Sequence, residues 1–535
     1  MPQSLTETIW NWYTVSNFSG GINNGDADRQ LLDHQVAVLE NYDLTTKGKA
    51  IVRLGSDALN SAIMYPVPTG ALSATSAPIR GLYRFYNTSG TNPWVAVCSG
   101  WIRYGTQSMS SYFASAKAIM ANGADVQFCT FKDYLFLVDG SKKYYTRCEG
   151  YGAGTAKVST WAGAPILNTI GVWNDMLWGV PAASAHMLRH TASAGCAHTW
   201  PAANNIVVGR QDGGSILAHT PLHGNYVILK DTGIYVLAGT HPDNYQLDQI
   251  SDHGCISRGS VVANDAPGGG IIYLAADGVR IFDGYTSQLL SESDVFKIEI
   301  IEAMNTANLS KITAEYFDRK YIMVYDDVAS TTSRNNAAWV YNFRTKSWTK
   351  YVNFNAGSLF KTKGADEDVS LYFGSSVSGF IFQGLTGTTD YGTTSLSCSI
   401  SATLKTKEYD MSDRYRNRAE TIKQFGIVKT TGNLAAGGIE QLTKIDRGYS
   451  LTQLDLLANQ VEGGFQLDID LLAEFNTDPN GARLGSGLSR FSHEKELQIE
   501  GAGKTINIQY TTTTLAGAGE LEALAIGYQD KTVRG

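Results

Sequence analysis

A short apolar strand, a turn ending in glycine and a second short apolar strand recur along most of the chain. Five such units centre on Gly100, Gly140, Gly233, Gly278 and Gly379. In each unit β-branched and aromatic residues alternate on either side of a turn such as D-G, D-T-G or S-G, where glycine accepts the positive φ of a tight hairpin. The pattern predicts five β-hairpins.

The spacing of these glycines is regular. The first and third gaps are close to 45 residues, and the second and fourth gaps are close to twice that length. The double gaps hold two further candidate units, Val172–His190 and Tyr321–Tyr351, each with a longer connecting loop. Such a period, with enough strand for a four-stranded sheet in each repeat, is typical of a β-propeller. We expect six or seven blades over residues 71–390, with a long β-sandwich or β-solenoid as the alternative.

The flanking segments follow other patterns. Residues 1–70 contain a glycine-rich start (Phe18–Gln30), an apolar-periodic stretch (Leu31–Tyr42) and a hairpin-like segment (Thr45–Ser56). A segment this short cannot bury a core alone, so its strands must complete another sheet. Residues 391–535 alternate as strands without a helical pattern and predict a β-sandwich or jelly-roll. The expected fold is therefore all-β, a six- to seven-bladed propeller plus a sandwich-like platform domain completed by the N-terminal segment.

Composition and charge exclude some classes of function. The 535 residues are 43% hydrophobic and only 17% charged, which argues for a folded chain. A formal charge of −7 disfavours tight binding of DNA phosphates. Six cysteines without a C-x-x-C pair are expected to be reduced and mostly core-filling. Neither a leader-like start nor an apolar run long enough to span a membrane is evident, so we expect assembly in a cytoplasm.

Candidate catalytic and metal-binding patterns are weak. The densest group of possible zinc ligands lacks H-E-x-x-H and a helical context, so loop and core histidines are the better interpretation. The acidic loops Asn23–Asp28 and Phe475–Gly481 offer oxygen ligands for Ca²⁺ but lack the EF-hand pattern, and turn formation explains their Asn, Asp and Gly residues. The turns at Asp139, Asp231 and Asp277 lack the S-x-D-x-G-x-x-W pattern of sialidases. We therefore expect no enzyme activity, catalytic metal or cofactor. The possible zinc ligands are His186, His190, Cys196, His198, His219 and His223.

A basic run lies near the start of the C-terminal region and includes Arg414, Arg416, Arg418 and Lys423. Such a run is usually a solvated face. The functional alternative is a contact with an acidic neighbouring subunit.

Three patches resemble phage tail nozzle proteins, also called tail tubular protein B, and the related packaged-DNA stabilisation proteins. In the first 55 residues the pattern is F-S-G-G-I, then L-E-N-Y-D-L, G-K and R-L-G, with Leu54 where the family often has proline. Segments within Trp339–Phe382 resemble late blades, and Ile400–Val428 resembles the strand that leads into the platform. The residues that this resemblance and the basic run make candidates for a platform and inter-subunit role are Phe18, Gly20, Gly21, Asn41, Arg53, Gly55, Arg414, Arg416 and Arg418.

The resemblance implies a structural virion protein. It implies a homo-oligomeric ring, usually of six subunits, docked below the portal–adaptor stack beside adaptor and fibre proteins, through which genomic DNA passes without tight binding. The alternatives are a tail adhesin whose propeller recognises a surface glycan, a propeller glycosidase, and a scaffold propeller of the WD type, which lacks its G-H…W-D signature here. Blade number, gate loops, receptor binding, host and neighbouring subunits are left open by the sequence.

Overall fold

The computed structural model consists almost entirely of β-strands. Its only helices among the described residues are five short 3-10 segments, Arg210–Asp212 (η1), Pro242–Asn244 (η2), Arg258–Ser260 (η3), Ile301–Ala303 (η4) and Thr306–Lys311 (η5). The residues described are 10–60, 78–86, 90, 92–105, 116–121, 125–146, 159–192, 199–263, 269–292, 299–331, 333–363, 368–387, 389–391, 397–411, 422–434, 439–446, 449–453, 493–512 and 519–530.

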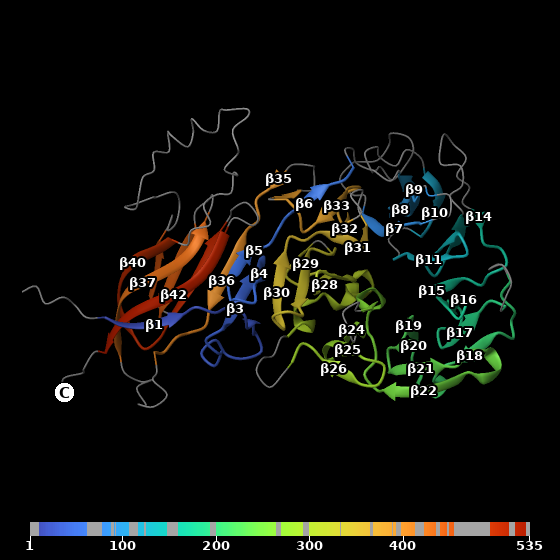
Figure 1. Ribbon diagram of the computed structural model, residues 1–535, viewed down its shortest axis with the longest axis horizontal. Helices are drawn as coiled ribbons and strands as arrows, with labels where there is room; N and C mark the ends of the chain where they lie inside the picture. Colours follow the sequence, from blue (N-terminus) through green and yellow to red (C-terminus); the bar gives the residue numbers. More distant parts are fainter. Residues whose placement is uncertain are drawn as a thin grey trace, which may run out of the picture.

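Seven antiparallel four-stranded units form the larger body, a β-propeller (Figure 1). The first strands of successive blades contact one another around the centre, and the last strands lie at the rim. The first four blades are β7 (Ile79–Arg84), β8 (Trp94–Cys98), β9 (Trp101–Gly105) and β10 (Ala116–Ile119); β11 (Gln127–Phe131), β12 (Tyr134–Val138), β13 (Lys143–Thr146) and β14 (Ser159–Thr160); β15 (Leu167–Trp173), β16 (Met176–Pro181), β17 (Met187–His190) and β18 (Asn205–Val207); and β19 (Ile216–Leu222), β20 (Asn225–Lys230), β21 (Ile234–Ala238) and β22 (Gln246–Ser251).

The last three blades complete the circle. They are β23 (Val262–Ala263), β24 (Ile271–Ala275), β25 (Gly278–Phe282) and β26 (Ser287–Leu289); β27 (Thr313–Phe317), β28 (Lys320–Tyr325), β29 (Ala337–Asn342) and β30 (Ser347–Val352); and β31 (Ala356–Lys363), β32 (Val369–Ser375), β33 (Ile381–Gly384) and β6 (Ser56–Ala58). The expected hairpins fall within these blades, including the two units placed in the double gaps. The blade number, left open by the sequence, is seven.

The middle strands of the blades are apolar on both faces because each blade is packed between two others. Strand β8 is buried at all five positions, and β24 likewise. Burial of both faces produces continuous apolar runs instead of strict alternation. These runs made the repeat visible in the sequence.

Strand β6 closes the propeller. It comes from the N-terminal segment and pairs antiparallel with β33, with Ser56 opposite Gly384 and Ala58 opposite Phe382. We expect residues 1–70 to join the platform as a whole, and this expectation is wrong for β6, which belongs to the seventh blade. The pairing of β6 with β33 joins opposite ends of the repeat region. It gives the seventh blade its fourth strand and closes the ring of blades.

The second body is a sandwich of two sheets, here called the platform. One sheet contains β4 (Tyr42–Leu44), β5 (Ala50–Val52), β42 (Gly519–Asp530), β37 (Lys423–Leu434) and β40 (His493–Gly503), with β1 (Asn11–Val15) paired to β42. The other contains β2 (Gly21–Ile22), β3 (Gln35–Glu40), β36 (Ala402–Thr406), β41 (Ile506–Thr512), β38 (Ile439–Ile445) and β39 (Tyr449–Gln453). The N-terminal strands thus complete the platform, as the fold prediction stated.

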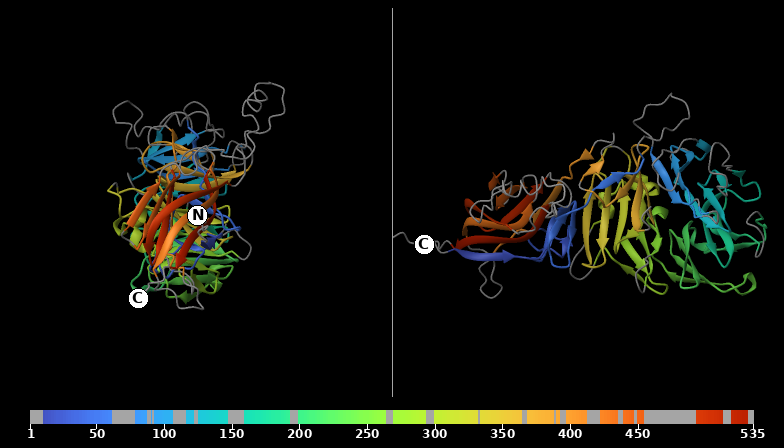
Figure 2. Two further views of the ribbon diagram at one scale, coloured as in Figure 1. Left: turned by 90° about the vertical axis from the view of Figure 1, so that its left-hand side faces the viewer. Right: turned by 45° about the horizontal axis from the view of Figure 1, so that its top comes forward.

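The propeller and the platform share one sheet. Strand β3 pairs in parallel with β30 of blade six, where Glu40 lies opposite Lys350, and antiparallel with β36 of the platform. One hydrophobic cluster runs from Leu274 and Trp348 of the propeller to Leu404 and Ile526 of the platform. The molecule is elongated as a result, with the platform beside the rim of the propeller (Figure 2).

Glycine serves two purposes in the hairpins. Gly140 adopts a positive φ of 82° in its turn, as the sequence pattern predicts. Gly233 does not have a positive φ, but a Cβ there would lie 2.6 Å from the carbonyl oxygen of Ser251. At Gly233 the requirement is therefore the close approach of β22, and not the turn conformation.

The closure of the propeller predicts a strong effect of one side chain that follows β6. Asn60 is buried, donates from Nδ2 to the carbonyl oxygen of Gly379 (3.0 Å) and accepts from the backbone N–H of Ile381 at Oδ1 (2.7 Å). Asn60→Ala should lower the free energy of unfolding by about 2–4 kcal/mol, because it leaves both backbone groups buried without these bonds. Urea unfolding measures this, with Asn11→Ala on the exposed end of β1 as the control, expected within about 0.5 kcal/mol. Equal effects of the two substitutions would contradict the closure role.

Candidate functional site

The candidate site is the junction where the N-terminal segment passes from the platform to the propeller. Arg53, between β5 and β6, is 1% exposed. Its Nη1 and Nη2 atoms donate to the two carboxylate oxygens of Asp390, at 3.1 and 2.5 Å, and its Nε donates to Oδ1 of Asn41 at 2.8 Å. Asp390 opens the short strand β34 (Asp390–Tyr391), which pairs with β35 (Ser397–Cys398) after the last blade. One guanidinium therefore joins the two ends of the propeller region.

Two aromatic rings of the propeller support the same guanidinium. The Cζ atom of Arg53 lies 5.3 Å from the ring centre of Tyr351 and 5.6 Å from that of Phe354. Cation–π attraction is strong where water is excluded. Burial raises the pKa of Tyr351 well above its ordinary value. The phenol therefore stays protonated and donates to Oδ1 of Asp43, 2.5 Å away.

Asn41 links three segments through its backbone and side chain. Its N–H donates to the carbonyl oxygen of Lys350 (2.8 Å), and its Oδ1 accepts from the N–H of Val352 (3.0 Å), both in β30. Its Nδ2 donates to the carbonyl oxygen of Ser401 at the start of the C-terminal strands (2.6 Å). The residue has a φ of 58°, a conformation that asparagine tolerates better than most residues.

Small or buried residues occupy the other predicted positions of the N-terminal segment. Phe18 is fully buried in the shared hydrophobic cluster. A Cβ on Gly21, which has a φ of 66°, would lie 2.7 Å from the carbonyl oxygen of Trp348. A Cβ on Gly55 would lie 2.1 Å from that of Thr389. The structure thus brings these residues together inside one chain, where they join platform and propeller.

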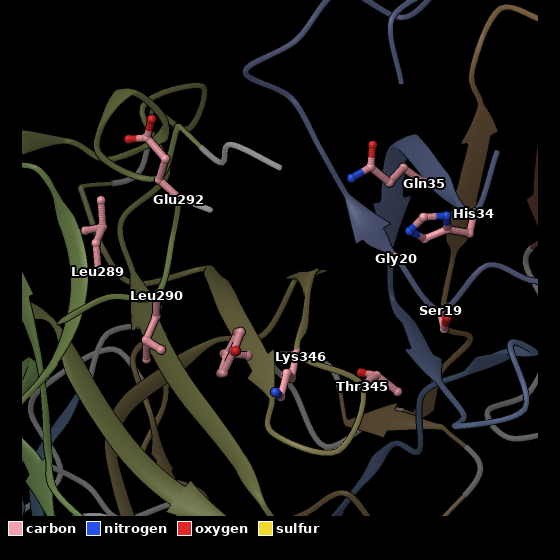
Figure 3. Close-up of a pocket in the computed structure, with 10 residues that line it drawn as sticks. Ser19, Gly20, His34, Gln35, Leu289, Leu290, Glu292, Thr345 and Lys346 are labelled. Atoms are coloured by element: carbon pink, nitrogen blue, oxygen red, sulfur yellow. The ribbon is translucent and has the colours of Figure 1, made fainter. Parts of the chain in front are cut away.

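A cleft of about 340 Å³ lies along the same junction (Figure 3). Ser19, Gly20, His34 and Gln35 line its platform side, and the opposite wall comes from the propeller. A side chain on Gly20 would collide with His34, since a Cβ there would lie 2.3 Å from its ring. The propeller wall consists of Leu289, Leu290, Glu292, Tyr341, Thr345 and Lys346.

The side chain of Gln35, which lines this cleft, stabilises the loop that precedes β3. Its Oε1 accepts from the N–H of Leu32 (3.0 Å) and from Nδ2 of Asn23 (3.2 Å). Asn23 also donates to Asp26, and Asp28 forms an ion pair with Lys405 of the platform. Turn and platform contacts therefore account for the acidic loop that the sequence offered as a calcium candidate. Across the described ranges, no three His, Cys, Asp or Glu side chains are grouped as metal ligands would be.

The four candidate zinc ligands that the structure describes are divided between two blades, with His186 and His190 in blade three and His219 and His223 in blade four. His190 ends β17, with its Nδ1 2.8 Å from the carbonyl oxygen of Thr191, and burial lowers its pKa. His219 in β19 is 2.8 Å from Oγ1 of Thr169 through Nε2 and 2.6 Å from the hydroxyl of Tyr226 through Nδ1. Burial lowers the pKa of His219 to about 3, so its imidazole is neutral. Both rings serve as hydrogen-bonded core groups.

Several sequence candidates lie outside the described residues. These are Arg414, Arg416 and Arg418 of the basic run, Cys196 and His198, and the loop Phe475–Gly481. Lys423, at the end of the basic run, opens β37 and donates from Nζ to the carbonyl oxygen of Asp410 (2.6 Å). Of the cysteines, Cys98, Cys129 and Cys255 are buried, and burial raises the pKa of each thiol to about 12.

Sequence reasoning missed the acidic partner of Arg53. Asp390 lies in a Thr- and Gly-rich segment, Gly384–Ser395, at a distance of 337 residues from Arg53 along the chain. A single carboxylate in such a segment carries no local signal for a buried pair. The contact follows only from the closure of the propeller, which brings both ends of the repeat region to one place.

Comparison with known protein families and with curated proteins finds no match. Among solved structures the chain is similar to the AfRom2 CNH domain, with 9% identity, a TM-score of 0.38 and coverage of 62% of this chain and 98% of that one. It is also similar to an exo-β-1,3-galactanase of Phanerochaete chrysosporium, with 10% identity, a TM-score of 0.23 and coverage of 84% and 100%. Similarities this low say nothing about activity. In the part of the chain that is described, no helix has the length and apolar character needed to cross a membrane.

The Arg53–Asp390 pair predicts a large and non-additive effect on stability. Asp390→Ala should lower the free energy of unfolding by about 3 kcal/mol, because Arg53 would remain buried without its counter-ion. The Arg53→Met/Asp390→Ala double variant should lose less than the sum of the single changes, with a coupling energy of about 1–3 kcal/mol. Urea unfolding of the four proteins gives this value. The exposed pair Arg344–Asp318, with a separation of 3.0 Å, is the matched control and should couple by less than about 1 kcal/mol. Coupling no larger than that of the control pair would contradict the role of the junction.

The lowered pKa of His219 predicts a loss of stability on acidification. The unfolded chain binds a proton at this ring below about pH 6.5, but the folded chain does so only near pH 3. Stability from this residue is therefore complete above pH 6.5 and declines as the pH falls toward 3, by up to about 1.4 kcal/mol per pH unit. His219→Gln should flatten this dependence in urea unfolding between about pH 7 and pH 4. His223→Gln, at an exposed ring, is the control, and equal pH profiles for wild type and His219→Gln would refute the assignment.

Proposed function

We propose that this chain is a non-enzymatic structural subunit of a bacteriophage tail, which forms the nozzle ring through which DNA leaves. The observation that carries the proposal is the fused junction between propeller and platform. Among the residues of the first 55 positions that resemble nozzle proteins, six lie at this junction, namely Phe18, Gly20, Gly21, Asn41, Arg53 and Gly55. A subunit that bears mechanical load needs a firm connection between its two bodies, and these six residues lie at that connection.

Rigidity supports this role. A sheet that continues from β27 through β3 to β39 cannot hinge between the two bodies without breaking backbone hydrogen bonds. The buried guanidinium of Arg53 and the shared hydrophobic cluster add to the same joint. A subunit of a ring has to keep the angle between its contact surface and its projecting body, and this joint fixes that angle.

The platform offers backbone for contact with neighbours. Strand β40 spans His493–Gly503 and, among the described strands, pairs only with β37. An edge of this length can receive a strand from another subunit. The outermost strands of the propeller blades are shorter among the described residues, as in β22 (Gln246–Ser251), and therefore offer less edge. Contacts between subunits through the platform therefore form a ring with the propellers as its projecting bodies.

Charge is consistent with passage of DNA. The net charge of −7 per chain makes a ring of such chains strongly acidic overall. A polyanion that moves through a channel is released more readily from a surface that does not neutralise its phosphates.

The test is the assembly state of the purified full chain and of a variant that lacks residues 1–55. Because β6 starts at Ser56, the deletion leaves the closing strand of the propeller in place. We expect hollow six-fold rings in negative-stain microscopy for the full chain. We expect none for the deleted chain, whose propeller should retain its β-rich circular dichroism. A compact monomeric full chain, or rings formed by the deleted chain, would overturn the proposal.

A further inference from the structure

A second cavity, of about 220 Å³, lies where the inner strands of the propeller begin. Its charged lining consists of Arg80, Asp125, Asp139, Arg258 and Lys311. Arg80 is in β7, Asp125 precedes β11, Arg258 precedes β23 and Lys311 precedes β27. Since the inner strands of a propeller run in the same direction, their first residues converge at one end of its axis. With Gly357 of β31, which also lines it, the cavity is an axial site built from five separate blades.

Both carboxylates of the cavity already have partners. Oδ2 of Asp125 accepts from Nη2 of Arg258 at 3.0 Å, and Arg258 also donates from Nη1 to the carbonyl oxygen of Asn168 at 2.5 Å. Asp139 accepts from the backbone N–H groups of Ala121 (2.6 Å) and Ser141 (2.8 Å). Asp125 is thus paired with Arg258, and Asp139 caps its own turn. Neither carboxylate forms an ion pair with Arg80 or Lys311.

Arg80 is a cation with two unsatisfied donors. It is only 8% exposed, and its Nε and Nη1 atoms are buried without a hydrogen-bond partner among the described residues. Burial lowers the pKa of its guanidinium, and the nearby charge of Asp125 opposes that shift. A buried donor without a partner costs about 1–3 kcal/mol, and more when it is charged. A group that accepts from these nitrogens would remove that cost.

Lys311 brings a second positive charge to the same cavity. Its Nζ donates to the carbonyl oxygen of Ser333 at 2.9 Å. Burial lowers its pKa, and the positive charge of Arg80 lowers it further, whereas Asp326 acts in the opposite direction. The Oδ2 atom of Asp326 accepts from Asn305 and Asn308, at 2.9 and 2.6 Å. Two cations that repel each other in one cavity form an attractive site for a shared anion.

We propose that this axial cavity binds an oxyanion, a phosphate or carboxylate group, between the Arg80 guanidinium and the Lys311 ammonium. Guanidinium and ammonium are the groups that proteins use for both anions. The proposal concerns the propeller alone and does not depend on assembly into a ring. The two sources of such a group are a free phosphate and the carboxylate of an acidic sugar.

The experiment is calorimetric titration of the full chain with inorganic phosphate and, separately, with glucuronate, in chloride buffer of matched ionic strength. We expect saturable binding of at least one anion. The anion that binds more tightly shows whether the site accepts a free phosphate or the carboxylate of an acidic sugar. Lys311→Gln should weaken that binding by about tenfold or more. Lys346→Gln, at an exposed lysine of the other cleft, is the matched control and should bind as wild type does.

A second measurement follows the buried charge. Arg80→Met should abolish the rise in melting temperature that the bound anion gives the wild type, since only a ligand that prefers the folded state produces such a rise. If this variant does not fold, Lys311→Gln provides the same measurement. Binding of neither anion, or wild-type affinity in Lys311→Gln, would overturn the proposal.

Discussion

The buried guanidinium of Arg53 is the interaction on which the arrangement of the two bodies depends. An arginine withdrawn from water loses a large hydration free energy, and this loss is recovered only when each of its donors meets a well-placed acceptor. Asp390, Asn41 and the carbonyl oxygen of Leu54 supply those acceptors. Asn41 and Leu54 lie in the N-terminal segment that docks on the platform, whereas Asp390 follows the last blade, so Asp390 reaches Arg53 only when the propeller is closed and this segment is docked. The pair therefore penalises every arrangement in which either step is incomplete.

Closure and docking are coupled through the short path of the N-terminal segment. Strand β3 extends blade six, β5 joins the platform sheet, and β6 completes blade seven, all within 24 residues counted from Gln35 to Ala58. A propeller closed only by its own consecutive strands would have no such constraint. Here the strand that closes the circle also leads directly from the platform, so separation of the two bodies would pull on the last blade.

Much of the fold was predictable, because repeated apolar runs buried on both faces are visible in the sequence. The turns were predictable only where glycine marks them. In blade three the turn between β15 and β16 consists of Asn174 and Asp175, with φ of 48° and 55°, and no glycine marks it. The candidate site was predictable in part: the sequence pattern singled out Arg53 and Asn41, but not Asp390 or Tyr351. Pairs separated by about three hundred residues leave no local pattern, since only the closed circle brings them together.

The positions that resemble nozzle proteins acquire a physical meaning from these contacts. Gly21 and Gly55 are places where another backbone passes too close for any side chain, and Asn41 adopts a left-handed conformation while its amide serves two bodies. Substitution at any of them disturbs the contacts between the propeller and the platform and leaves the outer surfaces of the molecule unchanged. The joint fixes the angle between the propeller and the platform, and with it the directions in which the outer surfaces of the two bodies face.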